Sequence, residues 1–116
     1  MFNYSTLNND KLEFVPIGSI NELKDGERLF IEIDGNSIVI INIHGQYYAI
    51  ADVCSHDDGP VGEGALEGFE IICPRHGARF DIRTGKVLAF PAFVDIPAYP
   101  IRVSGNQIEV GIPIED

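Results

Sequence analysis

The chain has 116 residues, of which 45% are hydrophobic and 22% are charged, and this composition is typical of one globular domain over residues 1–116. Its formal net charge of −10 at pH 7 disfavours nucleic acid and anionic membranes as partners, because both bind basic patches. Residues 1–10 lack the basic and apolar segments of an export signal, and no apolar run is long enough to cross a membrane. We therefore expect a soluble, cytoplasmic protein.

Short apolar and β-branched runs, separated by turn residues, predict an antiparallel all-β fold with little helix. Early in the chain, Ser19 and Glu22 have the spacing of a capping box, which predicts one helical turn. Two successive hairpins are expected next. The predicted strands are residues 28–33, 37–43 and 47–52, then two strands on either side of a Thr84-Gly85 turn within residues 78–88, and a closing hairpin over residues 99–112.

Both cysteines and two of the three histidines fall within residues 54–77. They form the pattern Cys54-x-His56, then sixteen residues, then Cys73-x-x-His76. Two thiolates with two imidazoles select zinc or an iron-sulfur centre. Zinc fingers usually open with a cysteine pair and close with a histidine pair, whereas here each segment offers one of each. One iron can then take both thiolates and another both imidazoles, which is Rieske-type ligation of a two-iron, two-sulfur cluster.

A disulfide between Cys54 and Cys73 is the less favoured alternative, because the sequence carries no export signal. Residues 53–77 are rich in glycine and lack a strand period over most of their length. A loop this long is uncommon in a small domain unless function holds it in place. The stretch therefore needs an organising centre, which the four ligand-type side chains would supply.

The segments CSH, CPRHG and RTGKV, with the sixteen-residue spacer, resemble the Rieske ferredoxins, in particular the small soluble electron carriers of aromatic-ring dioxygenase systems. The resemblance is strongest from Tyr47 to Val103. It implies an antiparallel β sandwich with a small cluster-binding subdomain at about residues 52–91. It also implies one 2Fe-2S cluster per chain, with the ligands Cys54, His56, Cys73 and His76.

The function that this resemblance implies is transfer of one electron from a ferredoxin reductase to a terminal oxygenase, with no catalytic residue in the chain. A catalytic oxygenase would need a mononuclear iron with two more histidines, and only His44, expected in a surface turn, remains after cluster ligation. Two other functions stay open. They are a small Rieske subunit of a nitrite-reductase-like enzyme and a structural zinc domain.

Two features separate the sequence from the high-potential Rieske proteins, and a third concerns the surroundings of the cluster. Ala78 and Phe80 stand where those proteins have a serine and a tyrosine, which predicts a low reduction potential of about −150 mV. The cysteine pair that bridges the two loops in those proteins is missing, since neither residues 57–59 nor Arg75 supplies one. Residues 89–93, which include Pro91, form either a third loop that shields the cluster or a surface turn.

Six acidic residues and no lysine or arginine lie within residues 51–72. This acidic stretch is either a solvated surface that keeps the protein soluble or a docking face for basic patches on protein partners. The acids considered for docking are Asp57, Asp58, Glu63 and Glu67.

Overall fold

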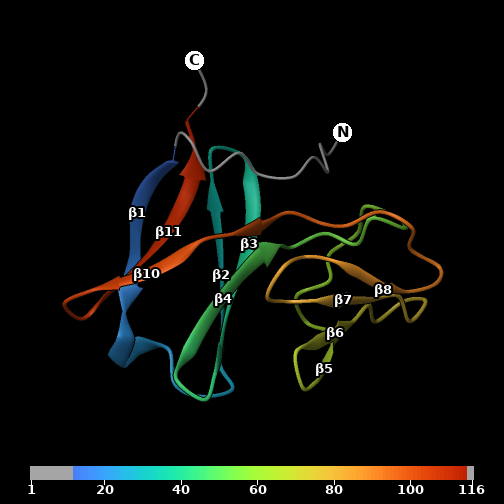
Figure 1. Ribbon diagram of the computed structural model, residues 1–116, viewed down its shortest axis with the longest axis horizontal. Coiled ribbons are helices and arrows are strands. Elements are labelled where there is room, and N and C mark those ends of the chain that lie inside the picture. Colours follow the sequence, from blue (N-terminus) through green and yellow to red (C-terminus); the bar gives the residue numbers. More distant parts are fainter. Residues whose placement is uncertain (1–11, 115–116) are drawn as a thin grey trace.

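The computed structural model describes residues 12–114, which form eleven β-strands and one short 3-10 helix, η1 (Ile20–Glu22). The strand pairings in this range are all antiparallel, which confirms the predicted all-β class (Figure 1). No membrane-spanning helix is found among these residues. The strands are β1 (Leu12–Ser19), β2 (Arg28–Ile33), β3 (Asn36–Ile43), β4 (Gln46–Ala51), β5 (Ala65–Glu67), β6 (Glu70–Ile72), β7 (Arg79–Asp81), β8 (Val87–Ala89), β9 (Ala98–Tyr99), β10 (Ile101–Ser104) and β11 (Gln107–Pro113).

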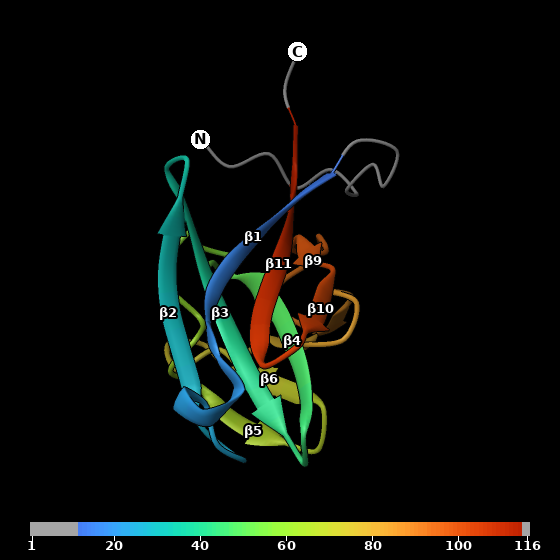
Figure 2. The ribbon, with the colours of Figure 1, turned by 90° about the vertical axis from the view of Figure 1, so that its left-hand side faces the viewer.

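The strands form three sheets, with the orders β1-β11-β10, β2-β3-β4-β9 and β5-β6-β7-β8. The first two sheets pack against each other as a sandwich, and apolar side chains from both fill the core between them (Figure 2). The third sheet is small and extends from one side of the sandwich, on the right in Figure 1. It spans residues 65–89, which lie inside the range predicted for the cluster-binding subdomain.

Strand β3 is buried on both faces, which explains its continuous apolar sequence. Side chains alternate across a strand, so Ile38 and Ile40 point one way and Val39 and Ile41 point the other. The first pair lies in the core between the two large sheets. The second pair lies in a core that also contains both cysteines. Burial of each such side chain stabilises the fold by about 1.5–3 kcal/mol, so β3 joins the sandwich firmly to the small sheet.

Most of the predicted elements are confirmed. Strand β2 has the predicted bounds, and β3 and β4 each begin one residue earlier than expected. The capping box is present, because the Ser19 N–H donates to Glu22 Oε1 (3.0 Å) and the Asn21 N–H donates to Ser19 Oγ (3.1 Å). The closing hairpin is formed by β10 and β11, but Tyr99, which was assigned to it, lies on β9 in another sheet.

Strands β1, β5 and β9 were not expected from the sequence pattern. Strand β1 contains Pro16 and Gly18, and its pairing with β11 shifts register between them. Proline and glycine obscure a strand pattern in sequence and often mark such irregularities. Strands β5 and β9 are only three and two residues long, so their conformation depends on the neighbouring strands rather than on local preference.

The turn between β7 and β8 contacts the segment of chain that follows the small sheet. The N–H groups of Thr84 and Gly85 both donate to the Asp81 carbonyl, at 3.3 and 2.7 Å, and the Ile96 N–H donates to the Gly85 carbonyl at 2.8 Å. Gly85 has a φ of 79°, and a Cβ added there would collide with the Ile96 carbonyl oxygen. The turn therefore requires glycine for both its conformation and the close approach of the chain.

Candidate metal centre

The structure brings the four predicted ligand residues together at the ends of two loops. Residues 52–64 join β4 to β5, and residues 73–78 join β6 to β7. Cys54 and Cys73 are 0% and 2% exposed, and both thiols are free. His56 and His76 are exposed, with ring centroids 5.0 Å apart and ring planes inclined by 88°. The disulfide alternative is therefore wrong, and the site has a buried thiol side and an exposed imidazole side.

Asp57 lies between the two sides of the site. A carboxylate oxygen of Asp57 lies within 4.8 Å of both cysteine sulfurs, and the carboxylate also lies within 4.8 Å of a ring nitrogen of His56 and of His76. From the sequence, Asp57 is only one member of the acidic stretch. Its position next to His56 was a signal that it lies near the site, but its proximity to the second loop depends on the fold.

The two loops share one backbone arrangement. In each loop the cysteine N–H donates to the carbonyl five residues later, and the N–H four residues later donates back to the cysteine carbonyl. These bonds are Cys54 to Gly59 (2.7 Å), Asp58 to Cys54 (2.7 Å), Cys73 to Ala78 (2.7 Å) and Gly77 to Cys73 (3.0 Å). The fourth residue has a positive φ in both loops, 60° at Asp58 and 79° at Gly77. Aspartate tolerates this conformation better than most residues, so a non-glycine residue serves in the first loop.

The two thiols lie in surroundings that oppose negative charge. Burial is the main cause that raises the pKa of the Cys54 thiol; a hydrogen bond with the His56 backbone lowers it, and the adjacent Cys73 raises it. Two thiolates side by side in an apolar core require a cation to balance their charge. A bound metal supplies that charge and displaces the thiol protons.

This donor set fits an iron-sulfur cluster with two chemically different ends. Soft thiol donors lie on the buried side, where the apolar core excludes water, and imidazole donors lie on the exposed side. Neither loop holds both donors of one kind, so the cluster would hold the two loops together. The residues present therefore match the mixed cysteine and histidine ligation of a two-iron cluster.

The side chain of Asp52, at the start of the first loop, and that of Arg28, from β2, hold this loop in position. Asp52 Oδ1 accepts hydrogen bonds from the N–H groups of Val61 (3.0 Å) and Gly62 (2.7 Å). The Arg28 guanidinium, from β2, donates to the carbonyls of Gly62 (2.5 Å) and Gly64 (2.7 Å). Four backbone groups of the loop thus have fixed partners, and the loop conformation is anchored to the sandwich.

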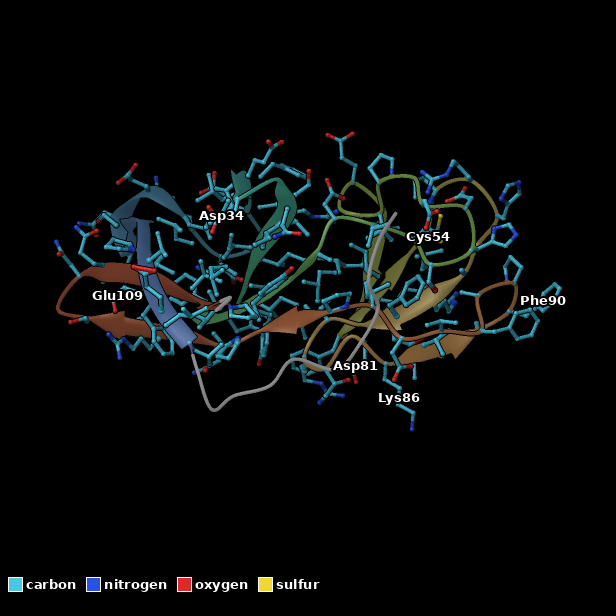
Figure 3. The ribbon with its side chains drawn as sticks, turned by 90° about the horizontal axis from the view of Figure 1, so that it is seen from above. Asp34, Cys54, Asp81, Lys86, Phe90 and Glu109 are labelled. Carbon is cyan, nitrogen blue, oxygen red and sulfur yellow. The ribbon has the colours of Figure 1, made fainter. Side chains whose placement is uncertain are left out.

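The third loop lies against the same end of the molecule. Ser55 Oγ donates to the Val94 carbonyl at 2.5 Å, and Ala92 is buried in the core that contains both cysteines. Phe90 and Phe93 are 76% and 78% exposed and contact each other edge to face, with centroids 5.6 Å apart. In Figure 3, Phe90 lies at the tip of the molecule on the same end as Cys54. The loop therefore borders the site while its aromatic side chains face solvent.

The acidic stretch is partly neutralised by arginines that follow it in sequence. Asp57 pairs with Arg75, and the hydrogen bonds from this guanidinium hold the pKa of the Asp57 carboxyl well below its usual range. Glu67 pairs with Arg79 at 2.8 Å. Neither pair was predicted from the sequence, because the two arginines come from the second loop and from β7.

His44 lies apart from the site, in the exposed turn between β3 and β4, as predicted. Its φ is 53°, its N–H donates to Asp25 Oδ1 at 2.7 Å, and its Nδ1 lies 3.3 Å from Asp25 Oδ2. These contacts hold the turn in place on the surface of the large sheet.

Comparison with known proteins identifies the family. The Rieske [2Fe-2S] domain matches residues 13–100, which is most of the chain. The chain belongs to this family. The cofactor of this Rieske ferredoxin is therefore a [2Fe-2S] cluster, and the structural zinc alternative is set aside.

Related proteins are the ferredoxin components of dioxygenase systems. The 3-phenylpropionate/cinnamic acid dioxygenase ferredoxin subunit of Shigella boydii serotype 4 is 37% identical over 95 residues, covering 81% of this chain and 89% of that protein. The ferredoxin of carbazole 1,9a-dioxygenase from Nocardioides aromaticivorans IC177 is 32% identical with a TM-score of 0.78, covering 84% of this chain and 95% of that chain. This Rieske ferredoxin is thus an electron carrier of the type found in dioxygenase systems.

The same fold occurs in a solved complex of reduced oxygenase and oxidized ferredoxin in carbazole 1,9a-dioxygenase. The matching chain has a TM-score of 0.79 and 23% identity, and the match covers 89% of this chain and 97% of that one. At this identity the likeness establishes the fold alone. It confirms the predicted all-β Rieske architecture with its small cluster-binding sheet.

We predict that Asp52→Ala destabilises this Rieske ferredoxin, because it leaves the N–H groups of Val61 and Gly62 without their partner. Loss of about 2 kcal/mol or more corresponds to a fall of about 1–2 M in the urea midpoint. Asp52→Asn keeps a side-chain oxygen and should shift the midpoint by less than half as much. Far-UV circular dichroism during urea unfolding measures both variants, and a parent-like midpoint for Asp52→Ala would contradict the anchoring role.

Proposed function

We propose that this Rieske ferredoxin carries one electron at a time from a ferredoxin reductase to the terminal oxygenase of an aromatic-ring dioxygenase system in the cytoplasm. When bound, the cluster supplies reversible one-electron chemistry. The observation that carries the proposal is the asymmetry of the site, in which both thiols are buried and both imidazoles are exposed. A protein partner can approach the imidazole side closely, whereas the protein core covers the thiol side.

The proposed ligands are Cys54 and Cys73 for the inner iron and His56 and His76 for the outer iron. The positions of the donor atoms support this assignment, because the sulfurs group together in the core and the ring nitrogens group together at the surface. The two exposed imidazoles then form the surface through which the electron leaves or enters. The chain holds the cofactor and presents it, and the bond chemistry takes place in the oxygenase.

The proposed docking face is the tip of the molecule around the imidazoles, and the exposed pair Phe90 and Phe93 supplies its apolar contact. Exposed aromatic side chains next to a functional site are frequent anchors of protein interfaces. The Ser55 to Val94 hydrogen bond fixes this loop against the first metal-binding loop. A partner that contacts the imidazoles therefore also contacts the aromatic pair.

Electrostatic steering at this face is proposed to be weaker than the acidic sequence suggests. Asp57 and Glu67 are paired with Arg75 and Arg79, so their charges are locally balanced. Glu63 is exposed in the first loop and remains a candidate for attraction of a basic partner surface.

The reduction potential is proposed to lie near the lower end of the Rieske range, at about −150 mV. Ala78 and Phe80 are fully buried in the same core as the two cysteines, and neither carries a hydroxyl group. A hydroxyl donor directed at the sulfurs would stabilise the reduced form more than the oxidised form, because reduction adds negative charge. Its absence keeps the potential low.

The ligand assignment predicts that Cys54→Ser and Cys73→Ser lose most of the bound iron, because the thiolates provide most of the charge neutralisation. His56→Cys and His76→Cys should retain a cluster with an altered spectrum. Iron and acid-labile sulfide analysis, with electron paramagnetic resonance of the dithionite-reduced protein, measures these outcomes. His44→Ala is the control and should match the parent. Full iron content in both serine variants would refute the assignment.

We predict that Phe80→Tyr or Ala78→Ser raises the reduction potential by tens of millivolts. This is on the order of the shift expected when one charge-assisted hydrogen bond stabilises the reduced cluster more than the oxidised cluster. Protein-film voltammetry at one pH measures the shift, and the visible spectrum checks that the cluster is intact. Phe14→Tyr, on β1 in the sandwich, is the matched control and should leave the potential unchanged. A parent potential well above zero, or no rise in either variant, would be inconsistent with the proposal.

The docking face predicts that Phe90→Ser and Phe93→Ser each weaken binding of the cognate oxygenase about fivefold or more, as expected for the loss of an aromatic anchor. The potential and the spectrum of the ferredoxin should not change. Val103→Ser is the control, because Val103 is an exposed apolar residue on β10. Stopped-flow reduction of the oxygenase gives the apparent affinity, and equal values for all three variants would place the docking face elsewhere.

A further inference from the structure

Arg75 joins the two metal-binding loops through three hydrogen bonds. Its Nε donates to Asp57 Oδ2 (2.5 Å), its Nη2 donates to Asp57 Oδ1 (2.8 Å), and its Nη1 donates to the Pro60 carbonyl (2.6 Å). Arg75 lies in the second loop, between Cys73 and His76, and its acceptors lie in the first loop. One side chain of the second loop therefore binds the first loop at two groups, the Asp57 carboxylate and the Pro60 carbonyl.

The geometry of this contact distinguishes it from an ordinary surface ion pair. The guanidinium and the carboxylate meet in a bidentate arrangement, which is the strongest and most directional form of such a pair. The side chains of Arg75 and Asp57 are only 33% and 23% exposed, so solvent screens the contact less than it screens a fully exposed pair. Asp57 is held further by the Gly59 N–H, which donates to Oδ1 at 3.0 Å.

Gly59 provides an independent observation that the loop is shaped around the guanidinium. A Cβ added at Gly59 would lie 2.8 Å from both Cζ and Nη2 of Arg75. The φ of Gly59 is not in the positive region, so its backbone conformation does not require glycine. The missing side chain leaves room for Arg75.

The chain has no covalent alternative at this place. Its two cysteines are Cys54 and Cys73, and both belong to the proposed ligand set, so no thiol remains to bridge the loops. Asp57 also lies within 4.8 Å of the donor atoms on both sides of the site, and its Oδ2 is 3.9 Å from His76 Nδ1. Arg75 therefore also keeps this carboxylate in a fixed position beside the ligands.

We propose that the Arg75–Asp57 pair is a noncovalent clamp that holds the two loops in the geometry that retains the cluster. Arg75 is a positioning residue in this role, because it acts through the loops and not by ligation. The inference rests on the proposed ligand assignment. It goes beyond that assignment, because it identifies what limits the lifetime of the bound cluster.

The test compares cluster loss from the loaded protein in Arg75→Gln, Asp57→Asn and the double variant. The decay of visible absorbance is followed in buffer that contains a chelator. Each single change should accelerate the loss roughly tenfold, as expected when charge-assisted hydrogen bonds are removed. The double variant should lose the cluster no faster than the single variants, because either change already opens the clamp.

Rescue and a geometric variant make the test specific. The exchanged pair Asp57→Arg with Arg75→Asp should recover part of the parent cluster lifetime. Arg75→Lys should have a cluster lifetime between those of the parent and Arg75→Gln, because lysine keeps the positive charge but lacks the planar guanidinium that makes two parallel hydrogen bonds. Gly59→Ala keeps both charges and should accelerate cluster loss by displacing the guanidinium. Reduced-state electron paramagnetic resonance should show a broader signal in the clamp variants, while the far-UV urea midpoint changes little.

Arg79→Gln is the matched control, because it breaks the pairing of Arg79 with Glu67 and Glu70 within the small sheet without changing either metal-binding loop. It should keep the parent lifetime. Parent-like cluster loss in both Arg75→Gln and Asp57→Asn, or additive effects in the double variant, would overturn the clamp and leave the proposed function intact. Iron retained in both cysteine-to-serine variants would instead overturn the ligand assignment, whatever the clamp variants show.

Discussion

The burial of Cys54 and Cys73 in one apolar core is the constraint on which the rest of the structure depends. Protonated thiols are small apolar groups that such a core accepts, but thiolates in the same place require an adjacent cation. Strand β3 connects this core to the sandwich, because alternate residues of its apolar run face the two cores. Metal binding at this end is therefore coupled to packing in the interior, and the site is part of the folded core.

The two loops share one backbone conformation, and each presents a thiol and an imidazole. The histidine follows the cysteine by two residues in the first loop and by three in the second, yet both imidazoles reach the surface next to each other. The supports of the loops differ. Arg28 attaches the first loop to the sandwich and Asp52 fixes the backbone within that loop, whereas the second loop is a tight turn between β6 and β7. The contact from Arg75 then links the longer, separately supported loop to the shorter one.

The end of the molecule that carries the imidazoles combines a small exposed apolar surface with a partly neutralised negative charge. Electron carriers exchange partners, so they need interfaces that form quickly and separate again, and such interfaces are small. The aromatic pair Phe90 and Phe93 offers contact area at the tip, while the arginine pairs limit the acidic field around it. These features match the carrier proposed above, which would use this face to contact each of its protein partners in turn.

The sequence alone determined the hairpins of residues 28–51 and the type of cofactor, and it supplied the proposed ligand set, because each depends on residues close together in the chain. A turn needs a few local residues, and each cysteine lies within three residues of its histidine, so spacing is informative. Only the tertiary structure decided the pairing of β1 with β11, the short strands β5 and β9, and the contact of Arg75 with Asp57, eighteen residues apart. These features depend on strand register and packing between distant segments, which local sequence patterns do not specify.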